Sequence, residues 1–539
     1  MSNASAATDL ETLHALLLAE RSKVEQLEAE RQAQSDVLAQ RERTIEQLRQ
    51  FIRELQRHRF GRRSEKLDAD QLALALEDME QQIGEAEAAQ AEVATASAAP
   101  TAPRVRPPRQ INRGALPEHL PREEVLLDIA DKTCPCCRGT LHRIGEERSE
   151  QLDVVPARLR VLVTVRPKYA CRACEEAIVQ APAPARIIQG GLPTDALVAH
   201  VAVAKYADHL PLYRQAQIFA RQGIALDRST MADWMGLAAF MLRPLHERML
   251  ALMMFSARLF ADETTAPVLD PGRGRTKTGK FWAYARDDRP WGGSDPPCVV
   301  YVYAPDRKAI RPAAHLAGFG GILQVDGYAA YPAALRGKVT FAFCWAHVRR
   351  GFYELYDPKA PAATPIAAEA LRRIAELYLI ERDLGGLDAD RRRAIRQQRS
   401  KPVIDALKPW LEENLPKVSR GSHLDKALRY ALNRWDGLIA FLDDGRIELD
   451  NNTVERSMRP IALGRKNHLF AGSDGGAEHW AILVSLIETC KLNAIDPEAY
   501  LVWLFGKLAH PRRMADVDEL LPWVYAASPK AASTVSAAT

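Results

Sequence analysis

Gly321-Ile-Leu-Gln-Val-Asp326-Gly327-Tyr328 is the stretch around which the rest of the chain can be organised. Its apolar residues predict a short buried strand, with Asp326 at the strand end, where Gly327 lets a ligand approach the backbone closely. Asp-Gly is also ordinary turn chemistry, so this stretch alone leaves a plain turn as an open alternative. A second acid on an upstream strand and a third at a downstream helix start favour a site for chemistry.

Further strands are predicted on both sides of this stretch, at residues 259–264, 280–285, 298–303 and 339–344. A helical crossover near residues 309–317 would join the third of them to the Asp326 strand. Three antiparallel strands followed by helix-linked parallel ones is the order of an RNase H-like domain. In that order Asp262 and Asp326 lie on neighbouring central strands. Two Mg²⁺ ions roughly 4 Å apart need such oxygen ligands and can clamp both reacting oxygens of a phosphodiester.

The third acid, Glu455, lies in a predicted helix start that Asn452 would cap and that Pro460 would interrupt soon after. Glu455 is either a further metal ligand or a capping-box glutamate tied to Arg459, four residues on. These residues by themselves leave both alternatives open.

Basic residues are unevenly distributed along the chain, although the formal net charge is only +4. Residues 271–280 form a predicted glycine-rich loop with cations and no acid, a composition suited to gripping a DNA backbone. Residues 57–66 place several cations around Phe60, so they are either a phosphate-binding motif or a solvated helix end. Residues 358–446 are too long for a loop and predict a helical insertion.

The N-terminal residues 10–58 follow a heptad pattern without proline or glycine. The pattern predicts a self-associating coiled coil, with a single amphipathic helix as the alternative. Further along, residues 212–234 predict a helix, a glycine turn and a capped second helix. That is the outline of a helix-turn-helix, although helical hairpins of this kind are also common without DNA binding.

Paired cysteines flank a strand-like segment at residues 159–165 and have the spacing of a zinc ribbon. Four thiolates would form a closed, structural Zn²⁺ site, against the alternatives of redox or unliganded cysteines. Cys136 is surplus to this set. The predicted ligands are Cys134, Cys137, Cys171 and Cys174.

The length of 539 residues implies several domains, and no apolar run is long enough to cross a bilayer. The N-terminus lacks the basic start and apolar segment of a signal peptide. Eight cysteines over this length do not suggest a disulfide scaffold. These features predict a cytoplasmic protein.

With these motifs in view, the chain resembles the transposases of the insertion-sequence sixty-six family, of the large TnpC type. The resemblance rests on the paired cysteines and on segments at 60–67, 205–214, 261–264, 326–328, 344–350, 450–460, 464–467 and 470–473. It implies a DDE triad at Asp262, Asp326 and Glu455, with two Mg²⁺ (or Mn²⁺) ions per active site. Cys344 and His347 resemble the Cys/His signature of several DDE groups, with a buried structural histidine as the alternative.

The resulting prediction is an α/β multidomain protein with an RNase H-like (DDE) core. Its expected segments are a coiled coil (10–58), a basic motif and linker (59–110), a zinc-binding module (111–182), an HTH-like helical segment (186–254), the first half of the core (255–357), the helical insertion (358–446), the second half of the core (447–512) and a tail (513–539). The candidate DNA contacts are Arg59, Arg62, Arg63, Arg273, Arg275, Lys277, Lys280, Arg349, Arg350, Arg456, Arg459, Arg465 and Lys466.

The expected activity is Mg²⁺-dependent cleavage at the ends of an insertion sequence and strand transfer into target DNA. The expected partners are double-stranded DNA, a second copy joined through the coiled coil, and companion proteins of the same element, in a bacterial, nucleoid-associated setting. Three alternatives remain open at this point: a DNA-binding regulator on an inactive catalytic fold, a nuclease that only hydrolyses, and a non-enzymatic scaffold.

Overall fold

The computed structural model describes residues 122, 124, 138, 159–170, 178–270, 272–328, 330–357, 364–510 and 516–526. The predicted coiled coil, the basic motif with Arg59, Arg62 and Arg63, and the four predicted zinc ligands lie outside the described residues. Among the described helices, none has the length and apolar character that crossing a membrane requires.

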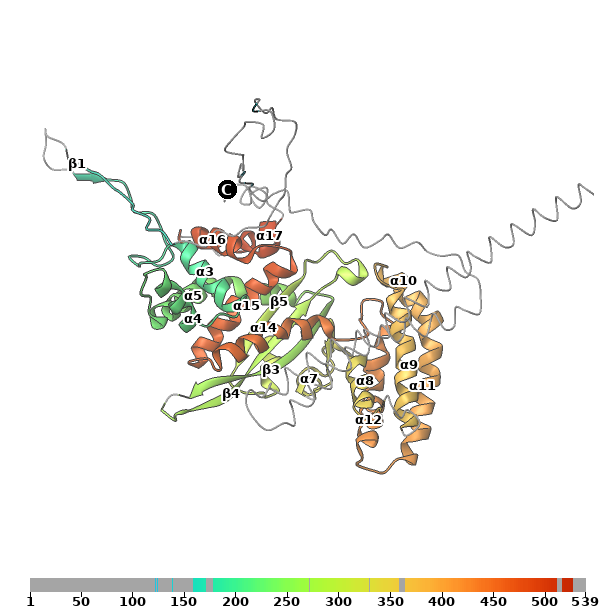
Figure 1. The fold of residues 1–539 in the computed structure, drawn as a ribbon. Coiled ribbons are helices and arrows are strands. Elements are labelled where there is room, and N and C mark those ends of the chain that lie inside the picture. Colours follow the sequence, from blue (N-terminus) through green and yellow to red (C-terminus); the bar gives the residue numbers. More distant parts are fainter. Residues whose placement is uncertain are drawn as a thin grey trace, which may run out of the picture.

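A five-stranded mixed sheet lies at the centre of the protein, with the strand order β5-β4-β3-β6-β7 (Figure 1). The first three strands pair antiparallel, and β6 and β7 run parallel to β3. This arrangement confirms the predicted strand types and the predicted neighbours. The strands are β3 (Arg258–Asp270), β4 (Arg275–Arg286), β5 (Cys298–Ala304), β6 (Ile322–Val325) and β7 (Thr340–Phe343).

Alternate residues of a strand point to opposite faces of a sheet, so neighbouring residues of β4 show which helices cover each face. On β4, Phe281 packs edge-to-face against Trp480 of α15 (Asp474–Leu492) with ring centroids 4.7 Å apart. Its neighbour Trp282 contacts Tyr331 of α7 (Ala330–Leu335) at 5.7 Å on the other face. The first face is also covered by α5 (Arg228–Met253) and α14 (Asn452–His468), and the second by α6 (Ile310–His315).

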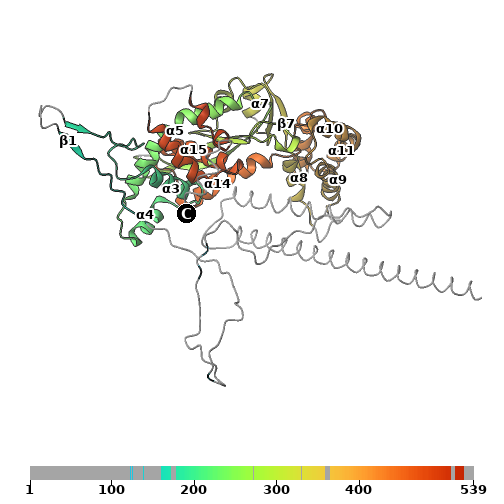
Figure 2. The same ribbon diagram turned by 90° about the horizontal axis from the view of Figure 1, so that it is seen from above.

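Two helical regions lie at opposite ends of the sheet (Figure 2). Beside α5 lie α3 (Asp195–Tyr206), α4 (Leu212–Arg221), α16 (Pro497–Leu508) and α17 (Pro522–Ala526). Beyond β7 lie α8 (Trp345–Tyr353), α9 (Pro365–Arg382), α10 (Ala389–Ile395), the π-helical turn η3 (Arg396–Ser400), α11 (Lys401–Asn414), α12 (His423–Leu432) and α13 (Trp435–Ile439). This second region has its own hydrophobic core, in which Trp345 packs against Trp435 at 6.0 Å. Residues 358–446 are therefore helical where the structure describes them.

The predicted helix-turn-helix has the expected local features but a different environment. Gly223 has a φ of +81°, and Asp227 accepts a hydrogen bond from the Ser229 backbone N–H at 2.7 Å. The second helix, α5, is 26 residues long and buries Met231 and Trp234 in the main core. A helix packed on a sheet cannot offer its full length to a major groove, so this burial argues against α5 as a groove-reading element.

Three predicted boundaries differ from the structure. Residues 275–280 belong to β4, because Arg275 to Lys280 pair in register with β3, so the predicted loop is a short turn. Residues 159–165 are not a strand; the hairpin strands are β1 (Lys168–Ala170) and β2 (Ile178–Gln180), on either side of the second cysteine pair. Residues 518–526 of the predicted tail fold onto the core, where Leu520 and Tyr525 are buried.

Stability should fall in mild acid because of His246 on α5. This side chain is 8% exposed, its Nε2 lies 2.8 Å from the Tyr301 carbonyl oxygen, and burial lowers its pKa from 6.5 to about 4. The unfolded state therefore binds the proton more tightly, so this contribution is fully present above pH 6.5 and is lost as the pH falls toward 4, by up to about 3 kcal/mol. Urea unfolding at a series of pH values should show a smaller loss in His246→Gln than in the unchanged protein. Parallel pH profiles for the two proteins would contradict this assignment.

Candidate active site

The structure brings the three predicted acids together. Phe260 of β3 pairs with Gln324 of β6, so Asp262 and Asp326, each two residues further along parallel strands, lie side by side. Glu455 lies in the first turn of α14, which packs across β3. Burial first, and then the nearby charges of Asp326, Glu263 and Glu455, raise the pKa of Asp262 well above its usual range. Carboxylates packed this closely repel one another and favour a bound cation.

The Asp-Gly turn that the sequence left open is present as well. Gly327 has a φ of +94°, a conformation that favours glycine, and the Tyr328 backbone N–H donates to Asp326 Oδ1 at 2.8 Å. The turn fixes the Asp326 carboxylate at the strand end. The plain turn and the strand-end acid, which the sequence offered as alternatives, are therefore one arrangement.

The predicted cap of α14 was wrong. Asn451 is the N-cap residue, and the helix continues through Pro460 to His468 because Ile461 and Arg465 beyond the proline are buried against the core. The capping-box alternative for Glu455 is also contradicted. The backbone N–H of Asn451 donates to Cys344 Sγ at 3.3 Å, and that of Asn452 donates to Asp450 Oδ1 at 3.1 Å. Neither N–H is therefore left for Glu455.

Cys344 and Asp450 anchor the segment that leads into α14. The Trp345 backbone N–H donates to the Leu449 carbonyl at 3.0 Å, beside the contact between Cys344 and Asn451. Burial raises the pKa of the Cys344 thiol well above its usual range, so the thiol is neutral and accepts a hydrogen bond. Burial also raises the pKa of Asp450 to about 7. In the described part of the chain, Cys344 thus helps to hold the segment that precedes α14.

Gln324 links two segments that carry acids, a contact that the sequence pattern did not single out. Its side chain is buried, accepts from the Glu448 N–H at 2.9 Å and donates to the Glu448 carbonyl at 3.0 Å. This pair of hydrogen bonds holds the segment that carries the third acid against the strand that carries the second. The sequence of residues 321–328 does indicate such a contact, because a glutamine inside an otherwise apolar strand needs a polar partner.

The donor atoms at Glu455 suit a divalent cation. Glu455 is 6% exposed, and its Oε1 has no hydrogen-bond partner among the described residues. His347 Nδ1 also has no hydrogen-bond partner among the described residues, and it lies 3.7 Å from Glu455 Oε1. Cys344, His347 and Glu455 each place one possible ligand atom within 4.8 Å of the others. A buried carboxylate oxygen without a partner is costly unless it binds a cation, and carboxylate oxygens are the ligands that Mg²⁺ takes.

The predicted DNA-binding cations that the structure describes are buried, half-buried or exposed. Arg465 is buried and donates to Thr265 Oγ1 at 2.7 Å, which argues against this side chain as a DNA contact. Lys277 pairs with Asp474 at 2.6 Å, and Arg273 pairs loosely with Asp270 at 3.5 Å. The exposed members of the set are Arg273, Arg275, Arg456 and Lys466, whereas the half-buried members are Lys277, Lys280, Arg349, Arg350 and Arg459.

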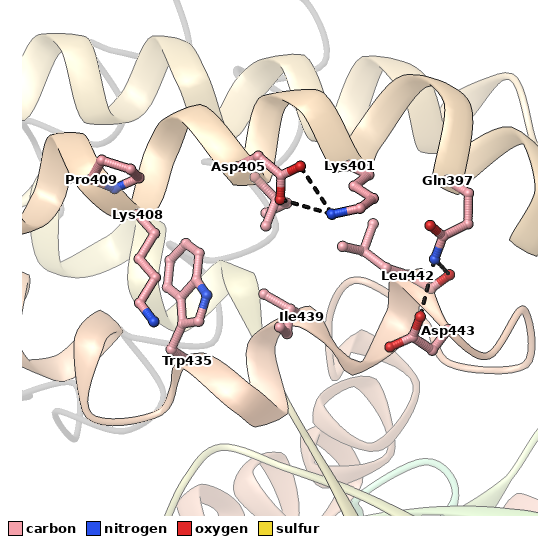
Figure 3. Close-up of a pocket in the computed structure, with 10 residues that line it drawn as sticks. Gln397, Lys401, Asp405, Lys408, Pro409, Trp435, Ile439, Leu442 and Asp443 are labelled. Carbon is pink, nitrogen blue, oxygen red and sulfur yellow. Dashed lines mark hydrogen bonds and ion pairs between the residues drawn. The ribbon is translucent and has the colours of Figure 1, made fainter.

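A pocket in the helical region lies apart from the three acids. Its lining includes the apolar side chains of Trp435 and Ile439 and the ammonium of Lys401, which pairs with Asp405 at 2.9 Å (Figure 3). The residues that line it come from η3, α11, α13 and the segment 442–443, and none of them belongs to the acid cluster. The pocket is therefore not the candidate active site.

Comparison with known proteins identifies the family of the chain. The family described as "Transposase IS66 family" matches residues 190–479, which include all three acids. Further matches are to the "zinc-finger binding domain of transposase IS66" at 131–175, "Transposase C of IS166 homeodomain" at 47–125 and "IS66 C-terminal element" at 485–523. The chain therefore belongs to the IS66 family of transposases.

Similar proteins are found in Sinorhizobium fredii. The uncharacterised protein y4jD is 49% identical over 76% of this chain and 82% of its own length. The uncharacterised protein y4qI is 43% identical over 89% of each chain. These names assign no activity, so the likeness extends the family membership over most of the chain and adds nothing about mechanism.

Proposed function

We propose that the protein is the DNA-cleaving and strand-joining enzyme of an insertion sequence, acting through Asp262, Asp326 and Glu455. The observation that supports this most strongly is the convergence of three carboxylates from β3, β6 and α14. The strand order supports an RNase H-like core. Family membership supports an insertion-sequence transposase, and the geometry adds which residues would perform the chemistry.

The three acids would hold two Mg²⁺ (or Mn²⁺) ions, which when bound supply an activated water and charge stabilisation at both reacting oxygens of a phosphodiester. The protein's own part is positioning. Asp326 is held by its turn, and Glu455 is aimed by a helix start that Cys344, Asp450 and Gln324 tie to the sheet. Cleavage next to the element end would free a 3′-OH, which then attacks target DNA at the same site.

The test is a cleavage and joining assay on DNA that carries the terminal inverted repeats of the element. Purified protein with Mg²⁺ should release a 3′-OH at the element end and then join that end to a target duplex. A hydrolytic nuclease would cut without joining. A regulator or a scaffold would show no metal-dependent cutting. We also propose that the protein self-associates through residues 10–58, acts with companion proteins of the same element and associates with the nucleoid.

The zinc module should contain one Zn²⁺ held by Cys134, Cys137, Cys171 and Cys174, with Cys136 left out. The match to a zinc-finger domain at residues 131–175 supports this set. Because four thiolates complete a closed tetrahedral site, Cys134→Ser should lower the zinc content of the purified protein, measured by atomic emission, several-fold. Cys136→Ser is the matched control and should keep the full content. If the two results were exchanged, Cys136 would be the ligand.

A further inference from the structure

Arg307 lies beside the acid cluster and takes no part in the function proposed above. It is in the loop between β5 and α6, next to Glu263, which directly follows Asp262, and next to Tyr328, two residues after Asp326. Asp326 is close enough to act electrostatically on both Glu263 and Arg307. Glu263 points to the same face of the sheet as Trp282 and Tyr331, opposite to Asp262, so Arg307 neighbours the group of acids on its Asp326 side.

The Arg307 side chain is fixed on two sides. Its Nε donates to Glu263 Oε1 at 2.6 Å, and its Nη2 pairs with the same oxygen. The guanidinium lies over the Tyr328 ring, with Cζ 3.6 Å from the ring centroid, and the Tyr328 hydroxyl donates to the Arg307 carbonyl at 3.0 Å. An arginine held by a carboxylate and an aromatic ring loses little conformational entropy when it binds a further anion.

The remaining edge of the guanidinium faces solvent. The side chain is 44% exposed, whereas that of Glu263 is 1% exposed. Arginine has five N–H donors in a fixed fork, and among the described residues no partner of Nη1 is found. Tyr331 donates to the second oxygen of Glu263 at 3.4 Å, so the carboxylate is satisfied from the protein side. The arrangement thus leaves N–H donors of a positioned cation available at the rim of the site.

We propose that Arg307 binds a backbone phosphate of the DNA strand that enters the acid cluster, with Glu263 and Tyr328 as its positioning residues. This rests on the function proposed above. DNA brings negative charge toward a group of carboxylates, so a fixed cation at the rim lowers the electrostatic cost of approach. Arginine suits the task because its fork matches the phosphate geometry. Other predicted contacts are less suited, since Arg465 is buried and Lys277 is already paired.

The test measures DNA binding by the full chain with Ca²⁺ in place of Mg²⁺, using a fluorescent duplex that carries the terminal inverted repeat. Arg307→Ala should raise Kd about fivefold and lower the slope of log Kd against log salt by about one, as expected for one lost phosphate contact. Arg307→Lys should recover part of the affinity. Arg311→Ala is the matched control, because Arg311 is a nearby half-exposed arginine paired with Asp306 at 3.0 Å, and it should behave as the unchanged protein.

A second variant separates phosphate binding from simple neutralisation of Glu263. The double variant Arg307→Ala/Glu263→Gln no longer has the buried Glu263 charge that Arg307 neutralises. If Arg307 only neutralises Glu263, this variant should recover the DNA affinity and the salt slope of the unchanged protein. Such a recovery would overturn the proposal. An unchanged Kd and slope in Arg307→Ala, with Mg²⁺-dependent cleavage intact in the unchanged protein, would overturn it while leaving the proposed function standing. DNA binding without any cleavage by the unchanged protein would overturn the proposed function alone, and loss of both would overturn the two together.

Discussion

Asp326→Asn is expected to lower Mg²⁺-dependent cleavage of the element ends by at least about a thousandfold, because metal-held charge stabilisation supplies several kcal/mol of the barrier reduction. The amide keeps the size and the hydrogen bond that Asp326 Oδ1 accepts from Tyr328. It removes one of the negative charges that now act on Asp262. The expected loss is therefore in chemistry, measured as the single-turnover rate of end cleavage.

DNA binding by Asp326→Asn should remain within about twofold of that of the unchanged protein, because phosphate contacts come from cations elsewhere. Asp405→Asn is the matched control, since Asp405 is an exposed carboxylate paired with Lys401 in the helical region. Its cleavage rate should not change. Strand transfer by Asp326→Asn at the normal rate would show that this acid does not hold a catalytic metal.

Arg258→Ala is expected to destabilise the protein by about 3–5 kcal/mol, the usual cost of removing one partner from a buried charge network. The side chain is fully buried at the start of β3. Its Nη1 donates to the Arg446 carbonyl at 2.5 Å and lies 3.3 Å from Glu448 Oε1, and its Nη2 donates to the Asp287 carbonyl at 2.5 Å. The substitution leaves these oxygens without this donor.

The measurement is the free energy of unfolding in urea. Arg391→Ala is the matched control, because Arg391 pairs with Asp388 at 3.3 Å and both side chains are exposed. An exposed pair of this kind contributes at most about 1 kcal/mol. Since Glu448 leads into the helix that carries Glu455, Arg258→Ala should also reduce cleavage. Equal stabilities for the two variants would contradict the network interpretation.

The strands and the first two acids could be predicted because both depend on local pattern. Largely apolar runs of four to seven residues, such as those of β5 and β6, are buried strands. Asp326 directly follows one of these runs, whereas Asp262 follows the apolar start of β3 and lies inside that strand. The start of α14 could not be predicted in the same way. Asn452 has the residue type of a cap, yet Asn451 occupies that position, because Cys344 and Asp450 take the backbone N–H groups of this turn.

Long-range contacts also changed the interpretation of several cations. Arg465 and Arg258 are indistinguishable from surface arginines by local sequence, but one donates to Thr265 and the other to Arg446 from buried positions. Burial depends on residues about 190–200 positions away in the chain, which no local pattern contains. The same applies to α5, whose short-range signals are those of a helical hairpin but whose apolar face packs on the sheet.

The sequence by itself determined the strand types, the approximate place of each acid and the family, since periodicity and motif spacing are local properties of the chain. Only the tertiary structure decided that Glu455 is not a capping glutamate, that Gln324 ties two acid-bearing segments together, and that Arg307 is positioned on Glu263 and Tyr328. The physical reason is that partners of buried polar groups are chosen by packing, which brings distant segments within hydrogen-bond distance.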